Sequence, residues 1–438
     1  MSTIHSPEVK TSTRDELLDM LQHGAFKYFM DKVNPANGLV ADSTWKGAPS
    51  SIAAVGFALA AYAVGVDREF ITRDEGIQYT LTTLRFFQNS LQGPEPDATG
   101  YKGFYYHFLD MQTGQRAWQC ELSTIDTTCL LAGMLASTLY FNRNVAGERE
   151  IRMIADALFQ RVDWRWALGG NSGATVTHGW MPESGFLKYR WEGYDEGLIL
   201  YVLGLGSPTH PLPADSYAAY TTTYRWENHY GHEFLYAAPL FIHQFSHIWI
   251  DFRGLQDDFM RAKGIDYFEN SRRATDMQQQ YAIDNPQKFA GYGKYCWGIT
   301  ASEGPGETVC QVNGVERRFF GYLARGVPQP DDGTLSPWVV IASLPFAPEI
   351  VLPTIEYYKE TYPELLGEYG FTCSLNPTFP GGSGSKSGWM SKHYYGLNEG
   401  PNVLMIENYR SGLVWRLMQQ CPYVIDGLRR AGFTGSWL

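Results

Sequence analysis

Apolar residues recur at helical spacing along almost the whole chain. Near the start, Thr13 and Glu16 form the pattern of a capping box, and Leu17, Leu18 and Leu21 follow on one helical face. The same spacing predicts helices over 49–66, 72–90, 123–141, 147–162, 194–205, 231–248, 264–281, 336–344, 348–362, 402–420 and 422–431. Because no compositional break or low-complexity linker interrupts this series, we expect one domain over residues 1–438.

Long segments rich in Gly and aromatic residues separate several of these helices. We expect a hairpin in each of these segments, which are 103–118, with its turn around Thr113-Gly114, 164–191, 304–330 and 378–400. Segments of such length are uncommon in loops unless they are functional. About twelve helices with such insertions predict an all-α fold, an (α/α)6 barrel (toroid) with long loops and hairpins around its pocket. The regular alternation of strands and helices that a TIM barrel needs is missing from the pattern.

Composition narrows the class of ligand. The net charge of -11 disfavours nucleic acids and anionic membranes, so a neutral oligo- or polysaccharide substrate is the better expectation. Aromatic residues make up 15% of the chain, which suits sugar recognition but is also typical of large helical cores. The sequence leaves the oligomeric state open.

The cysteines and the first residues bear on the compartment. The six cysteines form no CxxC pair and no zinc-type spacing, which is typical of reduced, buried thiols. Residues 1–10 lack the basic-then-apolar pattern of a signal peptide, and no apolar run is long enough to span a membrane. We therefore expect a cytoplasmic protein, or a periplasmic one if a signal peptide was removed.

The stretch 190–211 combines carboxylates with aromatic residues at the start of an apolar helix. Trp191 and Tyr194 stand beside Asp195 and Glu196. Rings pack against the C–H faces of a sugar, while a carboxyl group acts on the glycosidic oxygen. The alternative is electrostatic capping, since a helix N-terminus stabilises anions. That effect lowers a carboxyl pKa and would favour a base over an acid.

Two further carboxylates are candidates for catalysis. Asp126 follows Ser123 at the spacing of a capping box, but it also stands where an inner helix would meet the pocket. Both interpretations can hold together. Glu303 lies near Trp297 in a Gly-rich loop, where apolar surroundings would raise its pKa and suit a general acid. Glu407 is a weaker candidate, because Arg410 stands three residues on, at the spacing of an ion pair.

No pattern in the chain calls for a metal or an organic cofactor. His243 and His247 have a chelating i,i+4 spacing, but the glutamate of an HExxH motif is missing and aromatic neighbours favour buried, hydrogen-bonded histidines. Residues 381–388 are rich in Gly and Ser, yet the Gly-Lys-Ser order of a phosphate-binding loop is absent. We expect a flexible loop over the pocket there.

Several segments together resemble a known bacterial family, the glycoamylase-like domains that include the endo-β-1,2-glucanases of glycoside hydrolase family 144. The matching segments are 121–128 (ELSTIDTT), 193–211, 241–251 (FIHQFSHIWID), 281–286 (YAIDNP), 297–305 (WGITASEGP) and 407–412 (ENYRSG). The resemblance implies an (α/α)6 barrel that acts on β-1,2-glucan. Related branches release sophorose from chain ends, cyclise β-1,2-glucans or cut other linkages.

The resemblance also implies that Asp126, Glu196 and Glu303 are acidic positions of the pocket. We predict a glycoside hydrolase that cleaves β-1,2-glucan to sophoro-oligosaccharides with inversion. Glu196 or Glu303 would protonate the leaving oxygen, directly or through a substrate hydroxyl, and Asp126 or the remaining glutamate would activate water. The alternatives are a glucanotransferase, a hydrolase of another glucan linkage on the same fold, and a non-catalytic glucan-binding protein.

Further residues are candidates for substrate binding, as sugar platforms or as partners of sugar hydroxyls, although each of them is equally compatible with packing in the core. They are Trp180, Trp191, Tyr194, Trp297, Glu399 and Arg410.

Overall fold

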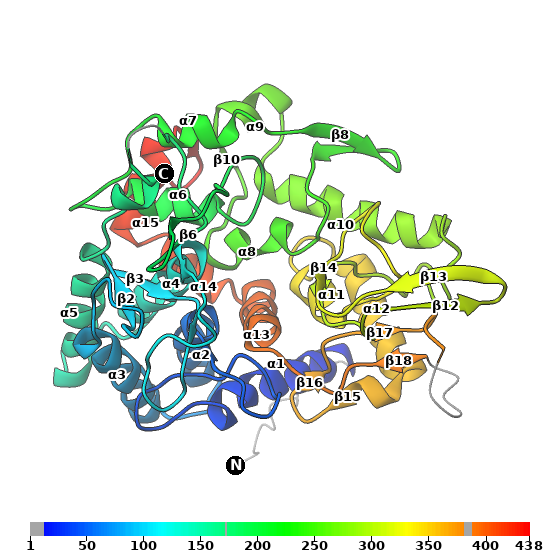
Figure 1. The fold of residues 1–438 in the computed structure, drawn as a ribbon, viewed down its shortest axis with the longest axis horizontal. Coiled ribbons are helices and arrows are strands. Elements are labelled where there is room, and N and C mark those ends of the chain that lie inside the picture. The colour runs from blue at the N-terminus through cyan, green and yellow to red at the C-terminus, as the bar shows by residue number, and fades with distance from the viewer. Residues whose placement is uncertain (1–12, 171–172, 381–387) are drawn as a thin grey trace, which may run out of the picture.

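Helices carry most of the regular structure in residues 13–170, 173–380 and 388–438, which the computed structural model describes (Figure 1). Six of them are buried over most of their length and form an inner set. They are α2 (Ile52–Asp67), α4 (Thr124–Tyr140), α6 (Leu198–Leu205), α8 (Ile242–Trp249), α11 (Pro337–Ala342) and α13 (Gly396–Arg410).

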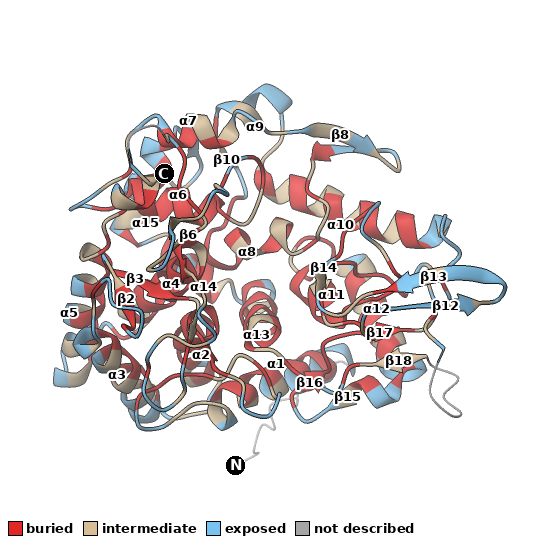
Figure 2. Cartoon of the chain, in the orientation of Figure 1, coloured by how far each residue is buried: buried red, intermediate tan, exposed pale blue. Residues whose placement is uncertain are grey.

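The inner helices contact one another in a closed series. Helix α2 packs on α4, α4 on α6, and α6 on α8, while α13 contacts α8, α11 and α2. Between α8 and α11, Gln244 Nε2 donates to the Val339 carbonyl oxygen at 2.7 Å. Most residues of these helices are buried, as the colouring of the cartoon in Figure 2 shows.

A second set of helices has one buried face and covers the inner set from outside. Helix α1 packs on α13, α3 on α2, α5 on α4, α15 on α6, α10 on α8 and α12 on α11. Their bounds are α1 (Thr13–Asp31), α3 (Arg73–Asn89), α5 (Ala146–Gln160), α10 (Tyr267–Asp284), α12 (Pro348–Thr361) and α15 (Pro422–Arg430). Three short helices complete the described set: α7 (Ser216–Thr221), α9 (Asp258–Lys263) and α14 (Leu413–Met418).

The strands are short and lie in the connections between helices. A five-stranded sheet has the order β2-β3-β5-β6-β7, and the remaining strands form antiparallel pairs: β1-β4, β8-β9, β10-β19, β11-β14, β12-β13, β15-β16 and β17-β18. The bounds are β1 (Ser50–Ser51), β2 (Gly100–Tyr101), β3 (Phe104–Tyr106), β4 (Phe108–Leu109), β5 (Leu122–Ser123), β6 (Gly179–Met181), β7 (Gly185–Phe186), β8 (Trp226–His229), β9 (His232–Leu235), β10 (Leu255–Gln256), β11 (Ala301–Ser302), β12 (Thr308–Val312), β13 (Val315–Phe319), β14 (Leu323–Ala324), β15 (Leu366–Gly367), β16 (Gly370–Phe371), β17 (Leu375–Asn376), β18 (Trp389–Met390) and β19 (Thr434–Gly435).

Most of the predicted elements are present, with some corrected bounds. Helix α3 begins with the full capping box of Thr72 and Glu75. The helix predicted over 231–248 is wrong in its first half, because residues 226–235 pair as the hairpin β8-β9. The helix predicted over 402–420 is interrupted at Gly412, whose φ of 67° ends α13 and begins α14. Hairpins occur as predicted within 103–118, 164–191 and 304–330. Residues 381–387 of the predicted flexible loop lie outside the described residues.

Helices α2 and α4 meet at two glycines that let their backbones touch. A Cβ atom on Gly133 would stand 1.9 Å from the carbonyl oxygen of Gly56, and one on Gly56 would stand 2.3 Å from the Cys129 carbonyl oxygen. Ser137 Oγ adds a hydrogen bond of 3.0 Å to the Leu59 carbonyl oxygen across the same interface. None of the helices in the described ranges is long and apolar enough to cross a membrane.

We predict that Gly133→Ala destabilises the fold, because the new methyl group collides with rigid backbone and forces α2 and α4 apart. Overpacking of this kind lowers the free energy of unfolding by about 1–3 kcal/mol. Thermal and urea unfolding of both variants measure the effect. Gly293→Ala is the matched control, since a Cβ there meets nothing within 4 Å. Equal stability of the two variants would contradict the close backbone contact.

Candidate active site

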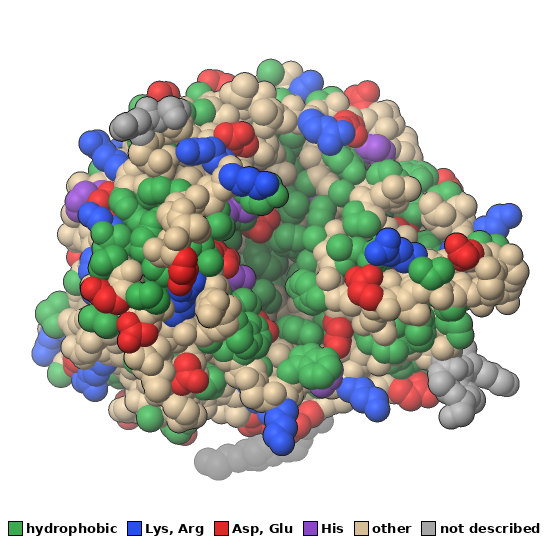
Figure 3. Space-filling view, in the orientation of Figure 1, with side chains coloured by type: hydrophobic (Ala, Val, Ile, Leu, Met, Phe, Trp, Pro, Cys, Tyr) green, Lys and Arg blue, Asp and Glu red, His purple; other side chains and the backbone are tan. Residues whose placement is uncertain are grey.

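A cavity of about 290 Å³ opens where the inner helices begin. Helices α4, α8, α11 and α13 contribute lining residues from their first turns, and Glu196 lies two residues before α6. Figure 3 shows this face of the molecule hollowed at its centre, with hydrophobic, acidic and histidine side chains around the hollow. The lining residues are His107, Glu121, Ser123, Ile125, Asp126, Cys129, His178, Trp191, Glu196, Phe241, Phe245, Ala301, Tyr322, Trp338, Leu397 and Asn398.

Asp126 lies in the first turn of α4, three residues after the N-cap Ser123, and its side chain faces the cavity. Ser123 Oγ accepts from the Asp126 backbone N–H at 3.2 Å and lies 2.5 Å from Asp126 Oδ2, to which it donates. His107 Nε2 lies 3.6 Å from the same Oδ2. The carboxylate is therefore oriented by a hydroxyl on one side and by an imidazole on the other.

His107 stands between two carboxylates. Its Nδ1 lies 2.9 Å from Glu121 Oε1, while its Nε2 faces Asp126, and its ring stacks on Phe108 with centroids 3.9 Å apart. Burial disfavours the charged ring, but the nearby charges of Asp126, Glu121 and Asp42 outweigh burial and raise the pKa of His107 to about 9. At neutral pH the ring is an imidazolium that donates a hydrogen bond to Glu121 and forms an ion pair with Asp126.

Burial favours the neutral, protonated form of Glu196, in contrast to the charged form that is favoured at His107. Burial, with a contribution from the charge of Asp126, raises the pKa of Glu196 to about 7. The expectation that a helix dipole lowers this pKa is therefore wrong. Glu196 precedes the helix that begins at Leu198, and the loss of hydration outweighs the dipole. The neighbouring Asp195 turns away from the lining, where its Oδ1 accepts from Gly197 N at 2.8 Å.

Trp191 forms part of the cavity lining, where it was predicted as a sugar platform. Its Nε1 donates to Thr124 Oγ1 at 2.9 Å, and the His178 ring stacks on it with centroids 3.8 Å apart and planes 16° apart.

Trp180, another predicted platform, does not belong to this lining. It packs against Tyr101 and Trp166 in an aromatic cluster at the five-stranded sheet.

Two predicted platforms are core residues instead. Trp297 has no exposed surface, and its Nε1 donates to Thr354 Oγ1 at 2.9 Å. Tyr194 is buried among the rings of Tyr224, His243 and Tyr267. Their predicted contact with sugar is therefore wrong, because both rings fill space between helices.

Arg410 and Glu399 also have other roles than the predicted ones. Arg410 ends α13, the helix whose first turn meets the cavity, and it pairs there with Asp19 Oδ1 at 2.6 Å. A helix of this length is about 22 Å long, so Arg410 cannot bind sugar in the cavity. Glu399 is 1% exposed, and burial raises its pKa well above the usual range. Its neighbour Asn398 is the residue that lines the cavity.

Glu303 lies apart from the pair formed by Asp126 and Glu196. It follows β11 next to the lining residue Ala301, and its Oε2 accepts a hydrogen bond from Ser391 Oγ. Its backbone carbonyl oxygen accepts from Ser374 Oγ at 2.5 Å. The structure thus brings two of the three predicted carboxylates into the cavity lining and holds the third beside residues 391–395.

Glu407, the weaker candidate, is an interior ion-pair partner. Its side chain is fully buried, and Arg68 Nε and Nη2 donate to its two carboxylate oxygens at 2.6 and 3.0 Å. The predicted partner Arg410 pairs with Asp19 instead.

Sequence reasoning missed much of the remaining lining. His107 and Tyr322 lie in segments that were recognised as unusual, 103–118 and 304–330, but no local spacing marks these residues within them. Phe245 and Asn398 are ordinary helix residues until the fold places both helices at the cavity. Asp42 lies close enough for its charge to raise the pKa of His107, and no sequence motif predicts that Asp42 lies at the site.

The histidines at the cavity and in α8 have hydrogen-bond or ion-pair partners. The ligand atoms of His107, Glu121 and Asp126 lie within 4.8 Å of one another, and the two ring nitrogens face different carboxylates, by a hydrogen bond to Glu121 and an ion pair with Asp126. His243 and His247 are buried, and they contact the Ala237 carbonyl oxygen at 3.2 Å and Ser271 Oγ at 3.0 Å. Burial lowers their pKa values to about 4 and about 3, so both are neutral.

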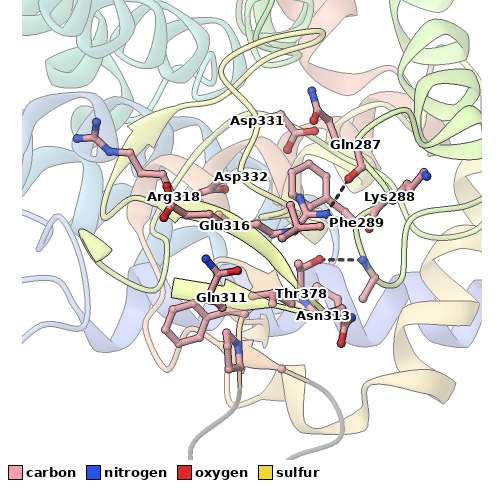
Figure 4. A pocket seen from close by; sticks show the side chains of 18 of the residues that line it. Gln287, Lys288, Phe289, Gln311, Asn313, Glu316, Arg318, Asp331, Asp332 and Thr378 are labelled. Carbon is pink, nitrogen blue, oxygen red and sulfur yellow. Dashed lines mark hydrogen bonds between the residues drawn. The ribbon is translucent and has the colours of Figure 1, made fainter. Parts of the chain in front are cut away.

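A larger groove of about 1080 Å³ lies beside the hairpin β12-β13 (Figure 4). Its lining is polar, and the carboxyl groups Glu316, Asp331 and Asp332 are spread along it. Tyr281 and Tyr292 hold Asp331 by hydrogen bonds of 2.8 and 2.7 Å. Its edge includes Pro380 and Gly388, which flank residues outside the described ranges, so we place no site there.

Comparisons with known proteins agree on one family. Residues 188–422 match the family Glycoamylase, described as "Putative glucoamylase". A curated relative, an exo β-1,2-glucooligosaccharide sophorohydrolase (non-reducing end) of Parabacteroides distasonis, is 28% identical over 95% of this chain and 58% of its own length. This chain therefore spans somewhat more than half the length of that relative.

Solved structures cover the chain almost completely. A Bacteroides uniformis protein with the same family description is 31% identical, with a TM-score of 0.86 over 98% of this chain and 100% of that chain. An endo-β-1,2-glucanase of Chitinophaga pinensis, in complex with sophorotriose and glucose, is 26% identical, with a TM-score of 0.84 over 98% and 100%. Because the family match takes in more than half of the 438 residues, the chain belongs to the glycoamylase family.

Proposed function

We propose that this protein is a glycoside hydrolase that cleaves β-1,2-linked glucan to sophoro-oligosaccharides. The observation that carries the proposal is the pair of carboxyl groups in one cavity, Glu196 with a pKa near 7 and Asp126 facing a positively charged His107. The substrate comes from the relatives, since both the sophorohydrolase and the Chitinophaga pinensis enzyme are named for β-1,2-glucan chemistry.

The two carboxyl groups suit complementary roles in the reaction. Glu196 retains its proton up to about neutral pH and gives it to the leaving glycosidic oxygen, directly or through a substrate hydroxyl. Asp126 accepts a proton from the attacking water, and His107 and Ser123 hold its carboxylate in place. We expect inversion, which requires room for the attacking water between the two carboxyl groups.

The closed series of six inner helices supports an (α/α)6 barrel as the full architecture. Along the chain, the helices alternate between the outer and inner sets from α1 to α5 and again from α10 to α13. Helix α15 returns at the end of the chain to cover α6. This assignment places the cavity at the shared N-terminal end of the inner helices.

The first test is hydrolysis of linear β-1,2-glucan, with α-1,4- and β-1,3-glucans as controls. We expect short sophoro-oligosaccharides from the first substrate alone, resolved by chromatography, and the α-anomer as the first product by NMR. Glucose released from the α-glucan, with β-1,2-glucan left intact, would contradict the proposed substrate. Products longer than the substrate would identify a glucanotransferase.

Glu196→Gln should lower kcat by roughly 10²–10⁴-fold, because the amide has no acidic proton for the leaving oxygen. Steady-state kinetics on β-1,2-glucan measure the loss, and thermal unfolding verifies that the variant is folded. Glu192→Gln is the matched control, since that exposed carboxylate accepts from Thr175 Oγ1 outside the cavity lining. A Glu196→Gln variant with nearly full kcat would exclude Glu196 as the acid.

The dependence of activity on pH should follow the proton on Glu196. The acid is competent below its pKa and loses its proton as the pH rises, so kcat/KM should fall about tenfold per unit above about pH 7. Initial rates from about pH 5 to about pH 9 measure this limb, which the residual activity of Glu196→Gln should lack. A profile that stays flat across the alkaline range would show that another group protonates the leaving oxygen.

A further inference from the structure

Large aromatic side chains stand exposed next to the cavity. Trp45 is 51% exposed and Tyr322 is 60% exposed, although side chains of this size are usually more deeply buried. Tyr322 is itself part of the cavity lining. Exposed rings that gather beside a ligand cavity are typical of a binding surface rather than of scattered surface residues.

These rings are connected to one another. Trp45 stacks on the His393 ring with centroids 3.8 Å apart and planes 18° apart, and its Nε1 donates to Tyr395 Oη at 3.1 Å. The Tyr395 ring centroid lies 6.0 Å from that of Tyr322. A continuous strip therefore runs from the cavity lining at Tyr322, across Tyr395, to Trp45. We call these three residues the aromatic strip.

The backbone holds the strip in place before any ligand binds. The loop that carries Trp45 is joined to the segment that carries Tyr395 by a bridge between Ser43 and Tyr395. The Thr44 N–H donates to the Tyr394 carbonyl oxygen at 3.0 Å, and Gly396 N donates to the Asp42 carbonyl oxygen at 2.8 Å. A rigid platform loses little conformational entropy when a ligand stacks on it.

A polar group for sugar hydroxyls lies beside the strip. Glu303 is half-buried, and its Oε2 accepts from Ser391 Oγ in the segment that leads to Tyr395. Burial, followed by the charge of Glu303, raises the pKa of the Tyr395 phenol, which places the carboxylate close to that ring. Apolar ring faces next to a carboxylate are the chemistry that binds a pyranose, by its C–H face and its hydroxyls.

The size of the cavity adds a reason for a second binding surface. Its volume of about 290 Å³ lies at the lower end of the range of roughly 300–1,000 Å³ that small-molecule pockets occupy. A glucan chain can place only a short part in such a space. The rest has to lie outside, and the aromatic strip is the exposed surface that continues from the lining.

We propose that Trp45, Tyr395 and Tyr322, with Glu303 beside them, form an outer carbohydrate subsite that binds the part of a glucan chain beyond the cavity. This assignment rests on the proposed function, because it takes the same substrate. It gives Glu303 a role in binding sugar hydroxyls outside the cavity, while Glu196 and Asp126 perform the bond cleavage.

The test compares Trp45→Ala, Trp45→Phe and Tyr409→Ala with the parent protein. Tyr409 is the matched control, an exposed aromatic residue at the end of α13 remote from the cavity. We expect Trp45→Ala to raise KM for long β-1,2-glucan about 3–10-fold more than KM for the shortest oligosaccharide that is cleaved, the size of effect that one stacking contact gives. Trp45→Phe should recover most of this difference, and Tyr409→Ala should behave like the parent.

Affinity electrophoresis in gels that contain β-1,2-glucan separates the possible failures. Weaker retardation of Trp45→Ala than of the parent supports the outer subsite, even if the parent binds the glucan without hydrolysing it and the proposed hydrolysis fails. Equal retardation together with an unchanged ratio of KM values overturns the subsite and leaves the hydrolase assignment standing. A parent protein that neither hydrolyses nor binds β-1,2-glucan overturns both.

Discussion

The proposed chemistry depends on how charge and protons are distributed among the carboxyl groups in one small cavity. Removing a carboxylate from water is costly, so each one has to be paired or has to retain its proton. Asp126 and Glu121 share a protonated His107, whereas no ion pair is formed by Glu196 within the described residues, and Glu196 holds its proton up to about neutral pH. The proposed roles of base and acid follow from which carboxyl group the imidazolium reaches.

The fold places the imidazolium of His107 beside Asp126 and not beside Glu196. The backbone N–H of His107 donates to the Glu121 carbonyl oxygen at 3.0 Å, so pairing beside the five-stranded sheet fixes the histidine next to the start of α4, where Asp126 lies. Glu196 comes from the turn before α6 and reaches the same cavity from a different helix. The close contact of α2 and α4 at Gly56 and Gly133 fixes the position of these two inner helices against each other. A catalytic pair held on such elements needs little reorganisation.

The sequence pattern predicted those features that depend on residues close together in the chain. The helices follow from apolar spacing, and Asp126 and Glu196 stand out because a cap or an aromatic cluster lies within a few residues of them. The remaining site residues depend on contacts between distant segments. Trp297 is a core residue because of Thr354, Arg410 is bound by Asp19, and Trp45 is aligned with the site by His393. Nothing near these residues in the sequence contains that information.

The aromatic content of the chain illustrates how burial changes the meaning of a residue type. Aromatic residues make up 15% of the sequence, and two of the four predicted platforms, Tyr194 and Trp297, fill space between helices. A ring in the core stabilises the fold through its buried area, whereas an exposed ring loses that stabilisation unless a ligand covers it. Exposure beside the cavity is therefore the informative property, and it selects Trp45 and Tyr322, which no sequence pattern had marked. In the proposed function, the cavity and the aromatic strip bind different parts of the substrate, with bond cleavage at Glu196 and Asp126 and recognition of the longer chain on the exposed rings.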